Sequence, residues 1–168
     1  MINVTILIPV YNEEATILQL LERVFAVSVE DFTLEVIVIE DGSSDRTLEL
    51  LESRPDLYSR LIKRPQNGGK GAAVIDGLNE ATGDYILFQD ADLEYDPGEY
   101  HKLFFPITRF EADVVIGSRF IAPEFTRVSY FWHKFGNRVL TFVFNILNNT
   151  TFTDIYSCYL VYRRDLVD

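Results

Sequence analysis

Residues 4–25 read VTILIPVYNEEATILQLLERVF and contain the unit that decides the fold. The β-branched apolar run from Val4 to Pro9 predicts a buried strand, and the stretch after the polar segment carries apolar residues at helical spacing. We expect Asn12 to cap this helix. The same alternation of strand and helix recurs along the first two thirds of the chain, which predicts an α/β fold with a mostly parallel sheet and helices on both faces.

The rest of the sequence extends this pattern. Further strands are expected at residues 35–39, 60–63, 85–89, 113–117 and 157–162, and further helices after residues 43–45, at 71–81 with Gly83 as the stop, from Pro97, and at 129–147. Near-continuous apolar strands are typical of sheets covered on both faces. With 168 residues, 48% of them apolar, and no internal linker, residues 1–168 are expected to form one domain.

The charge of the chain is unevenly distributed. The formal net charge is −11, and residues 1–100 carry 20 acidic and 7 basic side chains, whereas residues 101–168 carry 6 acidic and 8 basic ones. This balance disfavours nucleic acid as a partner. The N-terminus lacks the pattern of a secretory signal, and the apolar stretch at residues 139–147 is well short of the ~20 residues that span a bilayer. We therefore expect a cytoplasmic protein.

Polar clusters follow four of the expected strands. They are Pro9–Glu14, Glu40–Asp45, Gln89–Glu94 and Gly117–Arg119. Ligands of open α/β sheets bind at the carboxyl ends of the strands. The four clusters therefore predict one site at this edge of the sheet.

The third cluster contains the carboxylates Asp90, Asp92 and Glu94 at alternate positions. In an extended segment, alternate side chains point to the same side, so the three can converge. Oxygen ligands of this kind suit Mg or Mn bound together with substrate phosphates. The alternative is an ordinary acidic surface turn.

Other members of the clusters admit two interpretations each. Asp41 can accept an N–H from a nucleobase, or it can form an ordinary turn before the next helix. Glu13 is either a ligand or an acid favoured by the helix dipole. The glycine-rich segment around Lys70 can approach phosphate or form a flexible turn, and it does not match the P-loop or dinucleotide patterns. Arg119 is either a phosphate partner or a surface ion pair.

Five motifs taken in order resemble glycosyltransferase family two, in the branch of dolichol-phosphate mannosyltransferases and polyprenyl-phosphate glycosyltransferases. The motifs are Ile8–Glu14, Glu40–Ser43, Gly69–Ala72, Asp90–Glu94 and Gly117–Phe120. The resemblance implies a GT-A fold and an inverting transfer from a nucleoside diphosphate sugar, of the GDP-mannose or UDP-glucose type. The acceptor it implies is a polyprenyl or dolichyl phosphate, so the chain is also expected to lie at the inner face of a membrane.

The resemblance assigns roles to individual positions. The nucleoside would be held by Pro9, Tyr11, Glu13, Ile39 and Asp41; ribose, sugar and diphosphate by Asp90, Ala91 and Asp92; a metal by Asp90, Asp92 and Glu94; and a phosphate by Arg119. Lys70 is expected near phosphate from its glycine-rich segment, not from the resemblance. Asp92, Arg119 and Asp154 would be the catalytic set. A lipid phosphate acceptor is already anionic near neutral pH, so its oxygen needs no general base.

The C-terminal part departs from the family pattern. Residues 153–160 resemble the family segment Thr-Asp-x-Glu-Thr-Cys-Tyr-Lys, but Tyr156 and Leu160 replace the acid and the lysine, while Asp154 is retained. The family's catalytic domain usually continues further than Asp168. Two other functions are considered: a non-catalytic module that binds nucleotide sugars, and a phosphatase of the haloacid dehalogenase type, which the residues after Asp92 disfavour. The sequence does not indicate an oligomeric state.

Overall fold

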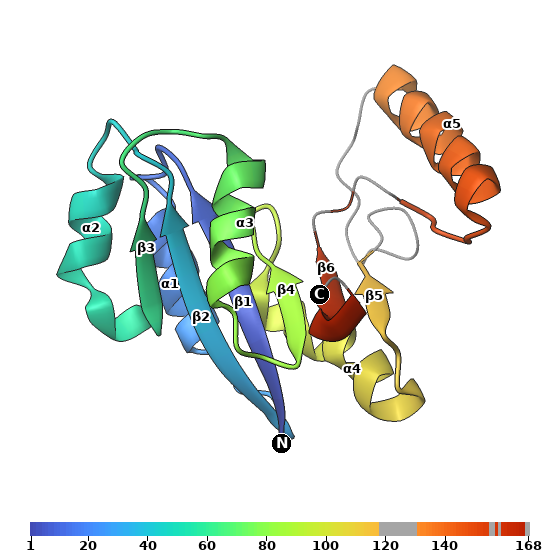
Figure 1. Ribbon diagram of the computed structural model, residues 1–168, viewed down its shortest axis with the longest axis horizontal. Helices are drawn as coiled ribbons and strands as arrows, with labels where there is room; N and C mark the ends of the chain where they lie inside the picture. Colours follow the sequence, from blue (N-terminus) through green and yellow to red (C-terminus); the bar gives the residue numbers. More distant parts are fainter. Residues whose placement is uncertain (118–130, 155–156, 158, 167–168) are drawn as a thin grey trace.

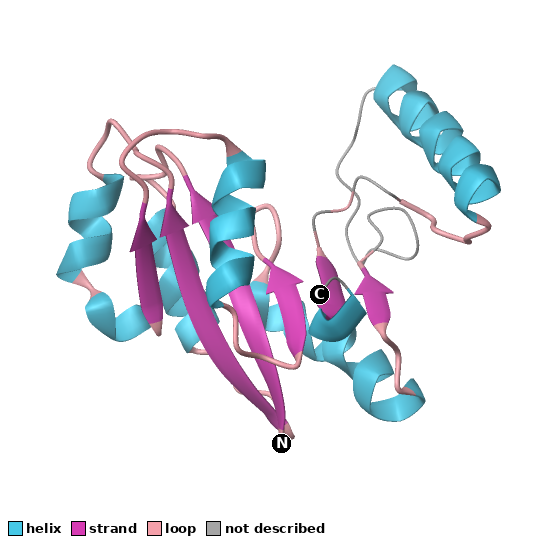
Figure 2. Ribbon diagram, viewed as in Figure 1, coloured by secondary structure: helices cyan, strands magenta, loops and turns pink. Residues whose placement is uncertain are grey.

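The computed structural model describes residues 1–117, 131–154, 157 and 159–166 and confirms the expected α/β fold (Figures 1 and 2). Within these residues, six strands form one sheet in the order β3-β2-β1-β4-β6-β5. The strands are β1 (Ile2–Val10), β2 (Phe32–Glu40), β3 (Arg60–Lys63), β4 (Tyr85–Phe88), β5 (Val114–Ile116) and β6 (Leu160–Arg163). The expected strand at residues 157–162 thus begins three residues later than the pattern suggests.

The sheet is parallel in one part and mixed in the other. Strands β1 to β4 pair in parallel, so their carboxyl ends lie at one edge. Strand β6, last in the sequence, inserts between β4 and β5 and pairs antiparallel with both. This insertion joins segments far apart in the chain, and local sequence patterns carry no signal for it.

Helices cover both faces of the sheet, as expected. The helices that cover it are α1 (Ile17–Phe25), α2 (Thr47–Ser53), α3 (Lys70–Glu80) and α4 (Tyr100–Phe110), and a further helix, α5 (Phe131–Asn148), lies apart from the sheet. Alternation along β1 sends Ile6 and Ile8 toward a core shared with α1, α2 and α4, and Leu7 toward a smaller core under α3. The two cores fix the sheet between the helices and thereby fix the edge at which the loops meet.

Two expected helix boundaries are wrong, and a third is shifted: Pro97 begins a short 3-10 turn, Pro97–Glu99, and α4 begins at Tyr100. Asn12 does not cap α1: the helix begins at Ile17, and Asn12 has a positive φ of 55° and belongs to the preceding loop. Gly83 does not terminate α3, which ends at Glu80. Gly83 instead lies against β1, where a Cβ would come within 2.6 Å of the backbone nitrogen of Thr5. Close approach, not helix termination, explains this glycine.

Helix α5 is set apart from the sheet (Figure 1). Large apolar side chains on it are exposed, and Trp132, Phe142 and Leu147 have exposed fractions of 73%, 65% and 77%. Asn145 and Asn137 connect it to the segment that follows, through bonds to Phe152 and Asp154. In the described part of the chain, no helix is both long and apolar enough to cross a membrane.

Candidate active site

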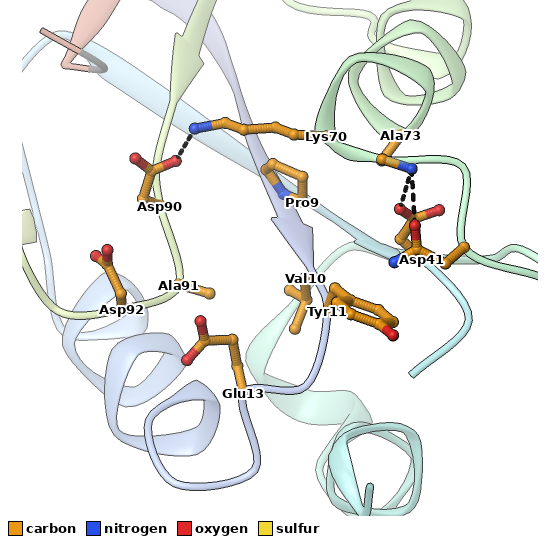
Figure 3. A pocket seen from close by; sticks show the side chains of 12 residues that line it. Pro9, Val10, Tyr11, Glu13, Asp41, Lys70, Ala73, Asp90, Ala91 and Asp92 are labelled. Atoms are coloured by element: carbon orange, nitrogen blue, oxygen red, sulfur yellow. Dashed lines mark hydrogen bonds and ion pairs between the residues drawn. The ribbon is translucent and has the colours of Figure 1, made fainter. Parts of the chain in front are cut away.

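An open pocket of about 350 Å³ lies at the carboxyl ends of β1, β2 and β4 and at the start of α3 (Figure 3). It is lined by Pro9, Val10, Tyr11, Glu13, Asp41, Asn67, Gly69, Lys70, Ala73, Asp90, Ala91 and Asp92. Three of the four expected polar clusters contribute to it. Topology therefore brings together residues up to 83 positions apart in the sequence, from Pro9 to Asp92.

The loops after β1 and β2 are joined by hydrogen bonds. The backbone N–H of Asn12 donates to Ser43 Oγ (3.0 Å), and Asn12 Oδ1 accepts from the backbone N–H of Ser44 (2.8 Å). The buried carboxylate of Glu40 accepts from the backbone N–H groups of Gly42 and Ser43. Asn12 thus stabilises the wall of the pocket, which explains why its side chain is not at a helix end.

Asp41 lies at one end of the pocket and is 2% exposed. Its carboxylate accepts hydrogen bonds from the backbone N–H of Gly68 (3.0 Å) and of Gly69 (2.9 Å), and it forms an ion pair with Arg64. These bonds tie the glycine-rich loop to β2. Reading of a nucleobase by Asp41 stays a prediction, and any such contact would add to these three.

Arg64 is a site residue that the sequence analysis missed. Its guanidinium bonds Asp41 and also Asp76 on α3 (Nε to Oδ2, 2.7 Å). The hydrogen bonds that Arg64 donates to Asp41 and then to Asp76 raise the pKa of its guanidinium above the ordinary value, so it remains a cation. The signal available in the sequence was its position directly after β3.

The other end of the pocket is acidic. Figure 3 shows the carboxylates of Asp90, Asp92 and Glu13 gathered on this side, with Lys70 reaching across from α3 to form an ion pair with Asp90. Glu13 accepts a hydrogen bond from the hydroxyl of Thr16 at 2.7 Å. Asp92 is exposed, and its Oδ1 accepts from the backbone N–H of Glu94 at 3.0 Å.

The expected convergence of Asp90, Asp92 and Glu94 assumed an extended segment, and this assumption is wrong. Strand β4 ends at Phe88, and the segment after it is a turn in which Leu93 has a positive φ of 63°. Glu94 consequently does not line the pocket. Among the residues that the structure describes, no three acidic, histidine or cysteine side chains are grouped as a metal centre.

Two carboxylates nevertheless fit a divalent cation of the Mg type. Asp90 and Asp92 both line the pocket, and such ions are commonly bound through one or two carboxylates completed by substrate phosphates and water. The all-oxygen donor set suits Mg or Mn rather than a metal that prefers sulfur or imidazole. The pair fits the cofactor expected from the sequence, with Glu94 outside it.

Two further predicted residues, Ile39 and Asp154, do not line the pocket. The side chain of Ile39 is fully buried in the core under α3, because it shares a face of β2 with Ile37. Asp154 is also fully buried and accepts a hydrogen bond from Asn137 Nδ2 at 2.8 Å. Arg119 lies outside the described residues. The roles expected of these three residues stay predictions.

The loop that carries the acidic residues is held by buried polar groups whose supporting role the sequence did not predict. They are the side chains of Gln89, Tyr100 and Tyr159. Burial raises the pKa of both tyrosine hydroxyls above the ordinary value, so they remain protonated and donate hydrogen bonds. In the sequence, these tyrosines resemble ordinary core residues, so nothing in the sequence indicates that their hydroxyls support the acidic loop.

Comparison with known proteins relates the chain to sugar transferases. The model of the family "Glycosyl transferase family 2" matches residues 5–168. An undecaprenyl-phosphate 4-deoxy-4-formamido-L-arabinose transferase of Proteus mirabilis is 31% identical over 99% of this chain and 50% of its own length. A dolichol-phosphate mannosyltransferase of Pyrococcus furiosus is 34% identical over 71% of this chain and 34% of its own length. The chain thus spans half the length of these relatives or less.

Solved structures share the fold. Glucosyl-3-phosphoglycerate synthase from Mycobacterium tuberculosis aligns with 99% of this chain and 58% of its own at a TM-score of 0.73 and 22% identity. A mannosyltransferase from Pyrobaculum calidifontis, solved with GDP-Man and Mn²⁺, aligns with 69% of this chain and 35% of its own at a TM-score of 0.58 and 27% identity.

Proposed function

The chain belongs to glycosyl transferase family 2, and from this premise we propose that it moves a sugar from a nucleoside diphosphate sugar to a polyprenyl phosphate. The observation that carries the proposal is the two-ended pocket. One end has a buried carboxylate and the aromatic side chain of Tyr11, and the other has Asp90, Asp92 and Lys70. This arrangement suits a ligand with an aromatic base at one end and a diphosphate at the other.

The acidic end is proposed to bind the diphosphate through a cation. Asp90 and Asp92 would hold Mg or Mn, in agreement with the Mn²⁺ present in solved relatives of this fold. When bound, the cation supplies Lewis-acid stabilisation of the negative charge on the departing nucleoside diphosphate. Glu94 is not included, since it does not line the pocket.

Lys70 is proposed to share this task. Its ammonium group reaches from the first residue of α3 to Asp90, beside the space that a diphosphate would occupy (Figure 3). A cation positioned where charge develops stabilises the transition state without further reorganisation. Asp41 and Arg64 fix the glycine-rich loop, and the loop in turn determines the position of the Lys70 backbone.

A phosphate acceptor agrees with the groups found in the pocket. Its oxygen is anionic near neutral pH and can attack the anomeric carbon without losing a proton first, so no general base is required. The names of both curated relatives contain lipid phosphates, undecaprenyl phosphate in one and dolichol phosphate in the other. We assign the same class of acceptor to this chain.

Helix α5 is proposed to bring the pocket to the lipid surface that carries such an acceptor. Its exposed residues Trp132, Phe135, Phe142 and Ile146 recur at helical spacing. Its sequence contains Lys134 and Arg138 and no acidic residue, in a chain of net charge −11. An apolar stripe with basic residues is typical of helices that lie in the interface of an anionic membrane.

The transferase proposal is tested by incubating the chain with Mn²⁺, a short polyprenyl phosphate and UDP- or GDP-sugars, and detecting the glycosylated lipid by mass spectrometry. Transfer that stops in EDTA is expected. Donor binding without any transfer would favour the non-catalytic binding module instead. Absence of both transfer and nucleotide binding would refute the proposal.

The membrane proposal is tested by vesicle sedimentation. Wild type is expected to bind vesicles containing anionic lipid, and Phe142→Ser with Ile146→Ser to lose most of that binding. Phe110→Ser, which removes an exposed aromatic residue from α4, is the matched control. Equal binding by all three proteins would contradict the role of α5, and self-association detected by sedimentation velocity would assign the helix to a second copy.

A further inference from the structure

The side chain of Gln89 closes the loop that carries the acidic residues. It follows β4, is fully buried, and its Nε2 donates to the backbone carbonyl oxygens of Asp90 (3.0 Å) and Tyr95 (3.2 Å). Its Oε1 accepts from the hydroxyl of Tyr100 at 2.9 Å. A single amide therefore joins both ends of the segment from Asp90 to Tyr95, and both of its N–H groups are used.

The burial of this amide is informative. Gln89 continues the apolar run of β4, where an apolar side chain would bury itself without the cost of desolvating an amide. A buried polar group is retained at no penalty only when its hydrogen bonds are satisfied, as they are here. All of the bonds from its nitrogen go to the acidic loop, so the loop is what this residue stabilises.

The loop itself needs such support. Leu93 at its centre has a φ of 63°, a conformation that is unfavourable for a residue with a side chain and that persists where the surrounding structure determines it. Beyond the amide, the hydroxyl of Tyr159 donates to the carbonyl oxygen of Asp96 at 2.7 Å, and the rings of Tyr95 and Tyr159 pack at 4.9 Å. These contacts anchor the side of the loop away from the pocket.

We infer that Gln89 is a positioning residue, which fixes residues 90–96 in the shape that presents Asp90 and Asp92 to the cation and diphosphate of the donor. The inference rests on the proposed function. Gln89 acts through the loop backbone and touches neither ligand. Its loss is therefore expected to weaken the cation-dependent part of nucleotide binding and to spare the part contributed by the other end of the pocket.

The experiment compares wild type with Gln89→Met, which keeps the length of the side chain and removes its hydrogen bonds. Tyr100→Phe is the matched control, because it removes the bond to Oε1 and leaves both bonds from Nε2 to the loop. Amide hydrogen exchange of residues 90–96 is measured without ligand, and calorimetry measures the affinity for UDP and for GDP in Mn²⁺ and in EDTA.

We expect faster exchange in residues 90–96 and at least a tenfold loss of affinity in Mn²⁺ for Gln89→Met, an unchanged affinity in EDTA, and smaller effects for Tyr100→Phe. Wild-type exchange in Gln89→Met, or equal affinity losses in Mn²⁺ and EDTA, would overturn the inference. If Gln89→Met does not fold, Gln89→Leu, which also removes both bonds from Nε2, is subjected to the same measurements, with the same expectation and the same overturning results.

Failure of the proposed function gives a different result. Wild type would then bind neither UDP nor GDP in Mn²⁺, which removes the positioning role together with the transferase assignment. The exchange measurement needs no ligand, so it decides separately whether Gln89 fixes the loop.

Discussion

The two ends of the pocket hold their carboxylates in opposite ways. Asp41 is buried and already accepts bonds from Arg64, Gly68 and Gly69, so its charge is compensated by the protein. Asp92 is exposed, and its one described bond to the protein is from the neighbouring backbone of Glu94. The first arrangement builds a rigid wall, and the second leaves oxygen atoms available to a ligand.

This difference predicts which substitutions change stability and which change binding. Removing a buried, paired charge leaves its partner uncompensated and lowers the free energy of unfolding. Removing an exposed carboxylate changes stability little, because solvent already satisfies it. The comparison is therefore tested by variants whose effects separate into these two measurements.

The largest effect is expected from Asp92→Ala. If Asp92 binds the cation, nucleotide affinity in Mn²⁺ should fall at least 100-fold, about 2.7 kcal/mol, with an unchanged melting temperature. Calorimetry with UDP and GDP measures the affinity. Glu94→Ala is the control from the same loop and should retain wild-type affinity within about threefold. An equal loss in both variants would restore the three-carboxylate site that the sequence alternation suggested.

Asp41→Ala is expected to act mainly on stability. It removes three hydrogen bonds and leaves Arg64 with Asp76 alone, which should lower the free energy of unfolding by about 2 kcal/mol. Urea denaturation measures this change. Asp76→Asn is the control, because its carboxylate is 42% exposed and should cost less than about 1 kcal/mol. Equal losses of unfolding free energy in the two variants would show that the burial of Asp41 does not make it more important for stability than Asp76.

The sequence predicted the parallel half of the fold and the position of the pocket because both follow from local patterns. Apolar runs define β1 and β4, and polar residues directly after them must lie at one sheet edge. It did not predict how the polar residues bond, since Arg64 reaches Asp41 and Tyr100 reaches Gln89 through tertiary packing. The acidic alternation failed for a related reason: a turn at Leu93 replaces the extended segment.

Substitution of Lys70 is expected to change two affinities in opposite directions. In Lys70→Met, Asp90 loses its ammonium partner, so Mn²⁺ alone should bind more tightly than to wild type. The nucleoside diphosphate should bind about tenfold more weakly in the presence of Mn²⁺, about 1.4 kcal/mol, because a cation beside the phosphates is lost. Titration calorimetry with Mn²⁺ alone and with UDP or GDP measures both. Weaker binding of Mn²⁺ alone would show that Lys70 does not compete for Asp90.

The smallest effect on stability is expected from Glu35, a carboxylate far from the pocket that serves as a reference for an acid with a structural role only. Glu35, near the start of β2, accepts hydrogen bonds from the hydroxyl of Thr5 and from the backbone N–H of Thr82. Burial raises the pKa of Glu35, but the bonds from Thr5 and Thr82 outweigh burial and lower it below the ordinary value of 4.5.

Because the folded-state pKa of Glu35 is the lower one, its ionised form stabilises the fold above pH 4.5, and this stability is lost as the pH falls through the folded-state pKa. Glu35→Gln should therefore be less stable than wild type by about 1 kcal/mol at pH 7, and the difference should shrink below pH 4.5. Urea denaturation from pH 3 to pH 7 measures it, with nucleotide affinity unchanged at pH 7. A difference that is constant across this range would show that hydrogen bonding, not ionisation, gives Glu35 its effect, and a loss of nucleotide affinity would remove it as a structural reference.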